Sequence, residues 1–285
     1  MNNSIEIWRR RGQYVIVGGR RVFVWEMGDG PPLVAIHGFP GSSYDWAKLA
    51  PLLLRRRFIA FDLFGYGLSD KSWPAGYSLL DQADLVEGVL KELRVERCDL
   101  LAHDMGDSVA SELLARANEG GLTFEIGRVV LLNGSVFIEL AQLTSGQKLF
   151  LKLPARPLPV PPPVRLFRRQ LKATFSESHR PDDNELAMAE SLLAWGGGHR
   201  LLPVTIRYIE ERRLRYVRWT SGLLDWRGPM TVIWGDRDPV AVPSIADRLL
   251  QLRPGTAAVR WGDVGHWPQL EVPHRVASEL RRVLA

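Results

Sequence analysis

Asp104, Asp238 and His266 are residue types that can make and break bonds, and each follows a short apolar run typical of a buried β-strand. The run before Asp104 is Cys98-Asp99-Leu100-Leu101-Ala102, and Gly106 stands shortly after it, at the start of an Ala/Val/Leu-rich helical pattern. A strand, a cramped turn and a helix make a nucleophile elbow, which holds one side chain exposed above a sheet. The usual nucleophile at an elbow is serine. A carboxylate there predicts formation of an alkyl ester on the enzyme instead.

The stretch around Asp104 has a simpler interpretation, in which this side chain only caps the helix that follows. The later acid and His266 help to decide between a helix cap and a nucleophile elbow. An acid stands in the later loop Gly235-Asp236-Arg237-Asp238, and His266 stands in the loop after the last apolar run. The order nucleophile, acid, histidine, with each group after its own strand, is that of the α/β hydrolases. This order favours the elbow, and at this point either Asp236 or Asp238 could be the acid.

The three loops can meet only if the strands before them run parallel in one sheet, because ligands bind outside the carboxyl ends of such strands. The alternating residues 14–17 and 21–26 around Gly18-Gly19 predict a β-hairpin. Buried strands are predicted at 32–36, 58–62, 98–102, 128–132, 230–234 and 257–261. Helices are predicted at 46–53, from Ser78 with its capping-box partner Asp81 to about Leu93, and at 273–284. Buried strands alternating with helices predict a mostly parallel, doubly wound α/β sheet.

The strand pattern stops between residues 138 and 227. Helical stretches at 185–193 and 204–219 appear there, and a proline-rich stretch occupies 154–163. A rigid connector within an inserted helical cap explains this stretch better than a binding motif for a partner domain. We therefore predict a core domain of residues 1–137 and 228–285 and a helical cap domain of residues 138–227.

Composition narrows the class of protein. The chain has 285 residues, 46% of them apolar, which is enough for one large domain with an insertion. Cys98 is the only cysteine, so no disulfide can form within the chain, and a role in the core is expected. The net charge of +5 comes mainly from scattered arginines without a nucleic-acid-binding module, so no nucleic-acid partner is expected. No apolar run reaches transmembrane length and no signal peptide is recognised, so a cytoplasmic location is expected.

These motifs resemble the α/β-hydrolase superfamily along nearly the whole chain. The matching stretches are His37-Gly38-Phe39-Pro40, the loop from Asp62 to Asp70, the elbow, Trp234-Gly235-x-x-Asp238 and Gly265-His266. His103-Asp104-x-Gly106 together with the His-Gly-x-Pro motif resembles the branch of epoxide hydrolases and haloalkane dehalogenases. Residues 41–46, 103–107, 131–134 and 267–271 are similar to the mesoderm-specific transcript protein group, an epoxide-hydrolase-like set.

The resemblance implies roles for individual residues. Asp104 is expected to be the nucleophile, His266 the general base, and Asp238, at the end of the Trp-Gly-x-x-Asp motif, the acid that orients it. The backbone N–H groups of Phe39 and Met105 are expected to form the oxyanion hole. The predicted substrate pocket contains His37, which also braces its loop, and Pro40, Trp195, Tyr216 and Trp267. His103 is expected to be structural.

The leaving group separates the two activities of this branch. An epoxide oxygen needs an O–H donor, normally cap tyrosines, whereas a halide needs N–H donors such as a tryptophan beside the nucleophile. Met105 stands there instead, which counts against a dehalogenase. Tyr208 matches the second cap tyrosine of epoxide hydrolases, although an ordinary packing role is open. The first cap tyrosine is missing, and Tyr44, His179 or Trp195 could replace it.

The sequence thus predicts an epoxide hydrolase that acts on a small hydrophobic epoxide through an Asp104 ester, with no cofactor and no metal, as a monomer or homodimer. Two alternatives stay open. One is a haloalkane dehalogenase that uses the same three residues, with halide donors among Trp195, Trp219 and Trp226. The other is a non-catalytic binding protein of the same fold.

Overall fold

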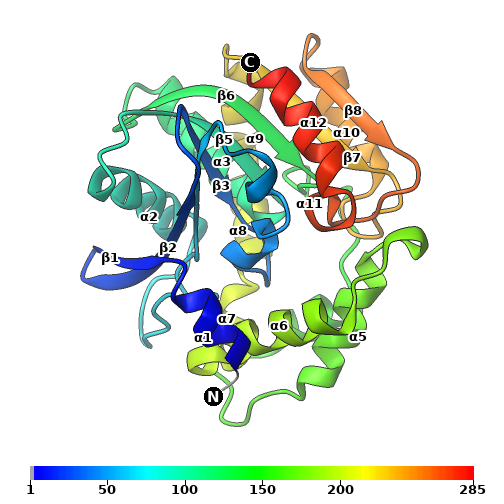
Figure 1. Ribbon diagram of the computed structural model, residues 1–285. Helices are drawn as coiled ribbons and strands as arrows, with labels where there is room; N and C mark the ends of the chain where they lie inside the picture. The colour runs from blue at the N-terminus through cyan, green and yellow to red at the C-terminus, as the bar shows by residue number, and fades with distance from the viewer. Residues whose placement is uncertain (1–2) are drawn as a thin grey trace.

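The protein is described by a computed structural model that covers residues 3–285. An eight-stranded sheet with the order β1-β2-β4-β3-β5-β6-β7-β8 runs through its centre (Figure 1). The strands are β1 (Gln13–Val17), β2 (Arg20–Met27), β3 (Pro32–Ile36), β4 (Arg57–Phe61), β5 (Arg97–His103), β6 (Glu125–Leu132), β7 (Met230–Gly235) and β8 (Ala257–Trp261). β1 and β2 form the predicted hairpin, β2 pairs antiparallel with β4, and the remaining pairs are parallel. The predicted mostly parallel, doubly wound sheet is confirmed.

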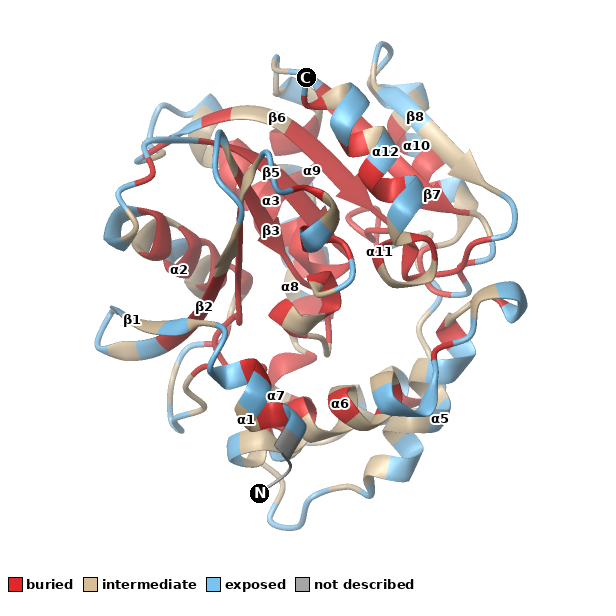
Figure 2. Ribbon diagram, viewed as in Figure 1, coloured by how far each residue is buried: buried red, intermediate tan, exposed pale blue. Residues whose placement is uncertain are grey.

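The central strands are buried on both faces because their side chains alternate between two cores (Figure 2). In β3, Val34 and Ile36 pack into the core that contains α2 (Leu79–Glu92) and α3 (Met105–Asn118). Leu33 and Ala35 pack on the opposite face, with α1 (Asn3–Arg9) and α12 (Pro273–Val283). Near-continuous apolar runs at these positions are the sequence signature of such strands.

One predicted helix before β5 differs from the structure and one agrees with it. A helix was expected at 46–53, but the chain there forms two 3₁₀ turns, η1 (Ser43–Trp46) and η2 (Ala50–Leu52). Pro51 has no N–H and its ring obstructs a preceding α-helical turn, so a continuous helix cannot cross it. The helix that begins after Ser78 forms as α2, with the predicted reciprocal hydrogen bonds between Ser78 and Asp81.

Helices occupy the chain between β6 and β7. They are α4 (Ser145–Lys152), α5 (Val164–Thr174), α6 (Asp183–Ala194), α7 (Leu202–Thr205), α8 (Tyr208–Leu214) and α9 (Tyr216–Asp225). The single helix expected at 204–219 is therefore broken, and the backbone leaves helical geometry at Arg215. Figure 1 shows α5, α6 and α7 below the sheet, while α8 and α9 lie close to α3. The division into core and cap domains stays a prediction.

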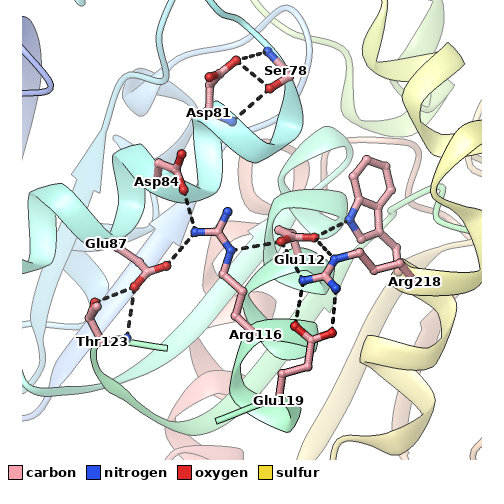
Figure 3. A network of polar contacts seen from close by, with 10 residues as sticks. Ser78, Asp81, Asp84, Glu87, Glu112, Arg116, Glu119, Thr123 and Arg218 are labelled. Atoms are coloured by element: carbon pink, nitrogen blue, oxygen red, sulfur yellow. Dashed lines mark hydrogen bonds and ion pairs between the residues drawn. The ribbon is translucent and has the colours of Figure 1, made fainter. Parts of the chain in front are cut away.

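Glu112 of α3 joins α9 to the core (Figure 3). Its buried carboxylate accepts hydrogen bonds from Arg116 Nε at 3.0 Å, Arg218 Nε at 2.7 Å and Trp219 Nε1 at 2.9 Å. Gly222 permits the close approach of the two helices, since a Cβ there would lie 2.5 Å from a backbone oxygen of α3. A buried carboxylate with several charged donors stabilises this contact, and removing it leaves those donors without their partner.

Glu112→Ala is expected to lower the free energy of unfolding by about 3 kcal/mol, the scale for removing one partner of a buried ion pair. Urea unfolding measures this as a lower midpoint. Glu119→Ala is the matched control, because Glu119 also binds Arg218 but its side chain is 58% exposed. We expect the control to lose less than about 1 kcal/mol. Equal losses in the two variants would show that Glu112 is not the anchor of this contact.

Candidate active site

Asp104 lies in the sharp turn between β5 and α3, with φ of 51° and ψ of −111°. A residue other than glycine at positive φ is strained, and such strain is concentrated at functional sites. Two glycines permit the turn. A Cβ at Gly38 would lie 2.5 Å from Cβ of Asp104, and one at Gly106 would lie 2.4 Å from the Ile36 oxygen. Although Asp104 precedes α3, its side chain makes no capping hydrogen bond. The interpretation of Asp104 as a helix cap is therefore wrong.

The carboxylate of Asp104 is held by the loop after β3. Its Oδ2 accepts a hydrogen bond from the backbone N–H of Phe39 at 2.8 Å. Met105 is the first residue of α3, so its N–H has no carbonyl partner within the helix. The two N–H groups predicted for an oxyanion hole thus stand on the loop and the helix that flank the carboxylate. One of them, the N–H of Phe39, donates to Oδ2.

His37 supports this loop from beneath. Its Nδ1 lies 2.8 Å from the Gly38 oxygen, and its Nε2 accepts from the N–H of Leu63 at 3.0 Å. Since a carbonyl oxygen only accepts, Nδ1 must carry the proton. Burial lowers the pKa of His37, which keeps the ring neutral. His37 contacts the loop that orients Phe39 and is absent from the lining of the cavity described below, so its predicted place in the pocket is wrong.

Asp238 and His266 meet at the ends of β7 and β8. His266 Nδ1 lies 2.6 Å from Asp238 Oδ2, and both side chains are almost fully buried. Asp238 Oδ1 accepts from the N–H groups of Val240 and Ala241 at 2.7 and 3.0 Å, which fixes the carboxylate. This arrangement holds the imidazole with Nδ1 toward Asp238 and places Nε2 on the opposite side of the ring.

Asp236 lies elsewhere. Its Oδ1 accepts from Arg260 Nε at 2.6 Å in a partly exposed ion pair on β8. The structure therefore brings Asp238, not Asp236, to His266, as the motif position suggested.

Asn133 is a polar neighbour of Asp238 that sequence reasoning missed. It follows β6 at φ of 43°, a conformation that asparagine tolerates better than most residues. Its Nδ2 donates to Asp238 Oδ2 at 2.8 Å and to the Gly235 oxygen at 3.0 Å, and its Oδ1 accepts from the Gly235 N–H at 2.9 Å. An asparagine directly after a buried strand, at the same sheet edge as the other polar residues, was the available signal.

The charge state of His266 depends on the carboxylates around it. Burial disfavours the charged ring, but the carboxylates of Asp238 and Asp104 outweigh it and raise the pKa of His266 to about 9. Behind it, His103 donates Nε2–H to the His266 oxygen at 2.7 Å. Burial and the nearby His266 hold the pKa of His103 well below its usual value, so this ring is neutral. His103 has the structural position that the sequence suggested.

A cavity of about 260 Å³ opens above these groups. Its lining is mainly apolar and includes Phe39, Pro40, Asp104, His266 and Trp267 from the core. Cap residues complete it, among them Gln147, Leu149, Phe150, Leu166, Phe167 and Leu171 from α4 and α5. An apolar cavity with few polar groups suits a hydrophobic small molecule.

Trp195 and Tyr216, predicted in the pocket, do not line this cavity. Tyr216 starts α9, where its hydroxyl donates to Glu139 at 2.8 Å near the surface, because the break at Arg215 redirects the helix. Trp195 packs beside the other core cluster, against the face of the sheet that α1 and α12 cover. Both predicted positions are wrong, whereas Pro40 and Trp267 do line the cavity.

Tyr208 is buried near Asp104. Its ring centroid lies 5.4 Å from that of Phe39, and its hydroxyl accepts from Gln147 Nε2 at 3.4 Å. The hydroxyl proton is therefore available to another acceptor. Burial and the Asp104 charge raise the pKa of Tyr208, so the phenol is neutral and can donate. Tyr208 itself does not line the cavity, but it is hydrogen-bonded to Gln147, which does.

Tyr66 is a second tyrosine near Asp104, and sequence reasoning missed it. Its hydroxyl donates to Met105 Sδ at 3.4 Å. Burial, together with the nearby Tyr208 and Asp104, raises its pKa well above the usual value. It belongs to the core loop after β4, so a search of the cap could not find it.

The substitutes expected for the missing cap tyrosine lie away from the cavity. Tyr44 packs against Trp8 at 5.0 Å, and His179 contacts Asp263 at 3.3 Å near the surface. The tryptophans suggested as halide donors are also absent from the cavity lining. Trp219 donates its N–H to Glu112. Trp267 lines the cavity, but its N–H is used by Thr174 at 2.8 Å.

Arg212 of α8 is a buried arginine whose position was not predicted from the sequence. Its Nε donates to Ser108 Oγ at 2.7 Å, and its Nη2 donates to the backbone oxygen of Asp104 at 3.1 Å. Its guanidinium lies over the Tyr208 ring, 4.7 Å from the centroid. Hydrogen bonds from α8 thus reach the turn that contains Asp104.

Within residues 3–285, no group of three or more His, Cys, Asp or Glu side chains could hold a metal ion. Over the same described range, no helix has both the length and the apolar character needed to cross a membrane.

Comparisons with known proteins identify the family to which the chain is similar. Residues 31–273 match the family described as the alpha/beta hydrolase fold. The chain is 38% identical to the Mycobacterium tuberculosis protein named "Putative hydrolase LipZ", over 96% of each protein. It is 33% identical to the mesoderm-specific transcript protein of Mus musculus, over 96% of this chain and 85% of that protein. A solved alpha/beta hydrolase fold protein from Burkholderia ambifaria superposes with a TM-score of 0.77 at 24% identity, over 94% of this chain and 96% of the other.

Proposed function

The chain belongs to the α/β-hydrolase fold family, and on that premise we propose that this hydrolase opens an epoxide to a vicinal diol through an ester on Asp104. The observation that carries the proposal is the carboxylate at the elbow, with Oδ2 on the Phe39 N–H. A serine would need a base to remove its proton, but a carboxylate is already ionised at pH 7 and can attack a strained carbon.

In the first step, Asp104 Oδ1 attacks an epoxide carbon and the bond from that carbon to the ring oxygen breaks. The ring oxygen takes a proton from an O–H donor, and Tyr208 is the cap residue proposed for this role. The product of the step is an alkyl ester of Asp104. Because Asp104 has then lost its charge, one of the carboxylates that raise the pKa of His266 is gone. The ring therefore loses its proton more easily at the stage where a base is needed.

In the second step, His266 Nε2 takes a proton from water, and the water oxygen attacks Cγ of the ester. Negative charge develops on Oδ2, where the Phe39 N–H already donates and the Met105 N–H is proposed to join it. An oxyanion-hole donor contributes about 3 kcal/mol to the barrier. Asp238 stabilises the protonated ring, as in other triads. The bond between Cγ and Oδ1 breaks, Oδ1 takes the proton held by His266 Nε2, and the diol leaves with that oxygen. The new carboxylic acid of Asp104 loses a proton and the Tyr208 phenolate gains one, so both groups return to their starting states.

A single turnover in water enriched in heavy oxygen tests the proposal. With an excess of enzyme over a styrene-oxide-like epoxide, the first diol is expected to carry unlabelled oxygen from Asp104. The label should appear in the Asp104 carboxylate and reach the diol only in later turnovers. Heavy oxygen in the first diol would contradict the ester mechanism, because water would then have attacked the epoxide directly.

Tyr208→Phe is expected to slow the formation of the ester by about a hundredfold, the lower end of the effect of a proton donor. Hydrolysis of the ester should keep its rate, because that step uses His266 and the N–H groups. Rapid-quench measurements with an epoxide separate the two steps. Tyr216→Phe is the matched control and should change neither, because this hydroxyl bonds to Glu139 away from the cavity. A Tyr208→Phe enzyme with unchanged ester formation would assign Tyr208 to packing.

A further inference from the structure

Residues 140–176, here called the basic cap segment, carry positive charge without compensation. Between Glu139 and Glu177 the chain has no Asp or Glu and seven Lys or Arg residues, Lys148, Lys152, Arg156, Arg165, Arg168, Arg169 and Lys172. The segment includes α4, the proline-rich connector and α5. Elsewhere in the described chain arginines commonly pair with acids, as in the contacts of Arg116, Arg218 and Arg260. The basic cap segment therefore concentrates one sign of charge.

Most of these charges face water and have no partner. Arg168 binds Glu190 at 2.7 Å. The other six cations are exposed, and within the described residues 3–285 none of them lies within 4.0 Å of a carboxylate. Along α5 the apolar side chains of Phe167 and Leu171 line the cavity, whereas Arg169 and Lys172 are exposed. Exposed cations that are close in the sequence and have no acidic partner are available to an anionic partner.

The same segment exposes large apolar side chains. Leu149 is 55% exposed, Val160 73% and Leu166 56%. Leu149 and Leu166 also line the cavity that contains Asp104 and His266. The helices that carry them touch, because Gly146 of α4 lies against the Gln170 side chain of α5, where a Cβ would come within 2.1 Å. The rim of the cavity is thus apolar, exposed and set within the basic surface.

We propose that the basic cap segment docks on an anionic lipid bilayer, with the rim of the cavity against the lipid. Lipid phosphates satisfy the unpaired cations, and the acyl region accepts Leu149, Val160 and Leu166. A nucleic acid would satisfy the cations but leave these apolar side chains in water. The bilayer also dissolves hydrophobic molecules of the kind that fit the cavity, so a substrate can pass from the lipid to Asp104. The inference does not depend on which bond is broken there.

Flotation with vesicles tests the docking. The full-length protein is mixed with vesicles of phosphatidylcholine alone or with about one-third phosphatidylglycerol. Binding is expected only with phosphatidylglycerol, and it should weaken as salt rises from about 0.1 M to about 0.5 M, since screening shortens the range of the charges. Lys148→Gln/Arg165→Gln/Arg169→Gln should bind about a hundredfold more weakly, because each cation near the surface contributes roughly fivefold. Its activity on a soluble monomeric substrate should be unchanged.

The matched control is Arg55→Gln/Lys91→Gln/Arg248→Gln, which removes three exposed cations from the core and is expected to bind as the unchanged protein does. Val160→Asp should also weaken binding, because it places a charge where an apolar contact is proposed. The proposal is overturned if both triple variants lose binding equally, which indicates net charge alone. It is also overturned if the protein ignores anionic vesicles, or binds duplex DNA with the same salt dependence and no vesicles.

Discussion

His266→Gln is expected to stop the reaction after its first step and leave one equivalent of substrate bound to Asp104 as an ester. In the proposed mechanism, Asp104 attacks the epoxide without help from His266, but water cannot attack the ester without a base. A glutamine amide can still donate to the buried Asp238 carboxylate, so that group is not left unpaired. Steady-state turnover should fall by at least about a thousandfold, the scale for loss of a triad member. Intact mass spectrometry should show the protein heavier by one substrate.

The location of the added mass is the decisive part of this experiment. Peptide mapping should find it on the peptide that contains Asp104. Asp104→Asn in the same His266→Gln background should remove it, since a neutral amide does not attack. An inactive His266→Gln protein that stays unmodified would contradict the proposed order of steps, as would one that still turns over at the normal rate.

Asp238→Asn is expected to lower turnover by about 10³- to 10⁴-fold, by analogy with the same change in serine-protease triads. Asp238 Oδ2 accepts from both His266 Nδ1 and Asn133 Nδ2. Both carboxylate oxygens of Asp238 accept hydrogen bonds. In asparagine only one of the two atoms is an oxygen, and the other is an NH₂ group that cannot accept. If that group faces His266, Nδ1 must become the acceptor and the proton moves to Nε2. The ring then cannot take a proton from water.

Asp236→Asn is the matched control, two residues away with the same chemical change. Asp236 binds Arg260 in a partly exposed pair, so its loss should change turnover less than about twofold and stability by less than about 1 kcal/mol. Single-turnover rates of ester hydrolysis and thermal unfolding should be measured for both variants. Equal losses of activity would contradict the assignment of Asp238 as the residue that orients His266.

The sequence predicted the sheet and the positions of Asp104, Asp238 and His266 because their signals are local. Asp104 and Asp238 follow near-continuous apolar runs, which are typical of buried parallel strands. A buried strand was also expected at 257–261, but β8 lies at the edge of the sheet and its residues are exposed or half-buried. The position of His266 was predictable because the carboxyl ends of parallel strands meet at one edge of the sheet. The composition of β3 and the capping pair at Ser78 likewise depend on a few adjacent residues, and both predictions were correct.

The cap was harder to predict because its contacts are long-range. Whether Tyr208 and Tyr216 share a face depends on the break at Arg215, and no proline or glycine marks it. The sequence predicted a single helical stretch at 204–219 and placed Tyr216 in the pocket. In the structure Tyr216 does not line the cavity. The burial of Arg212 was not predicted, because arginine is mostly exposed in proteins and its contacts with Ser108 and Asp104 form only in the folded chain. Tyr66 lies on a core loop, so only the folded chain shows its proximity to Tyr208.

The hydrogen bond from Arg212 to the backbone oxygen of Asp104 limits which segments of this protein can be exchanged with those of a relative. The cap of a relative could bring a different substrate range, but the elbow would lose a donor unless the new cap supplied an arginine at the corresponding point. Chimeras should therefore exchange α4 and α5, which line the cavity, and keep α8 and α9 with the core. A chimera of this kind keeps the hydrogen bond to the backbone of Asp104 and changes the residues that line the cavity.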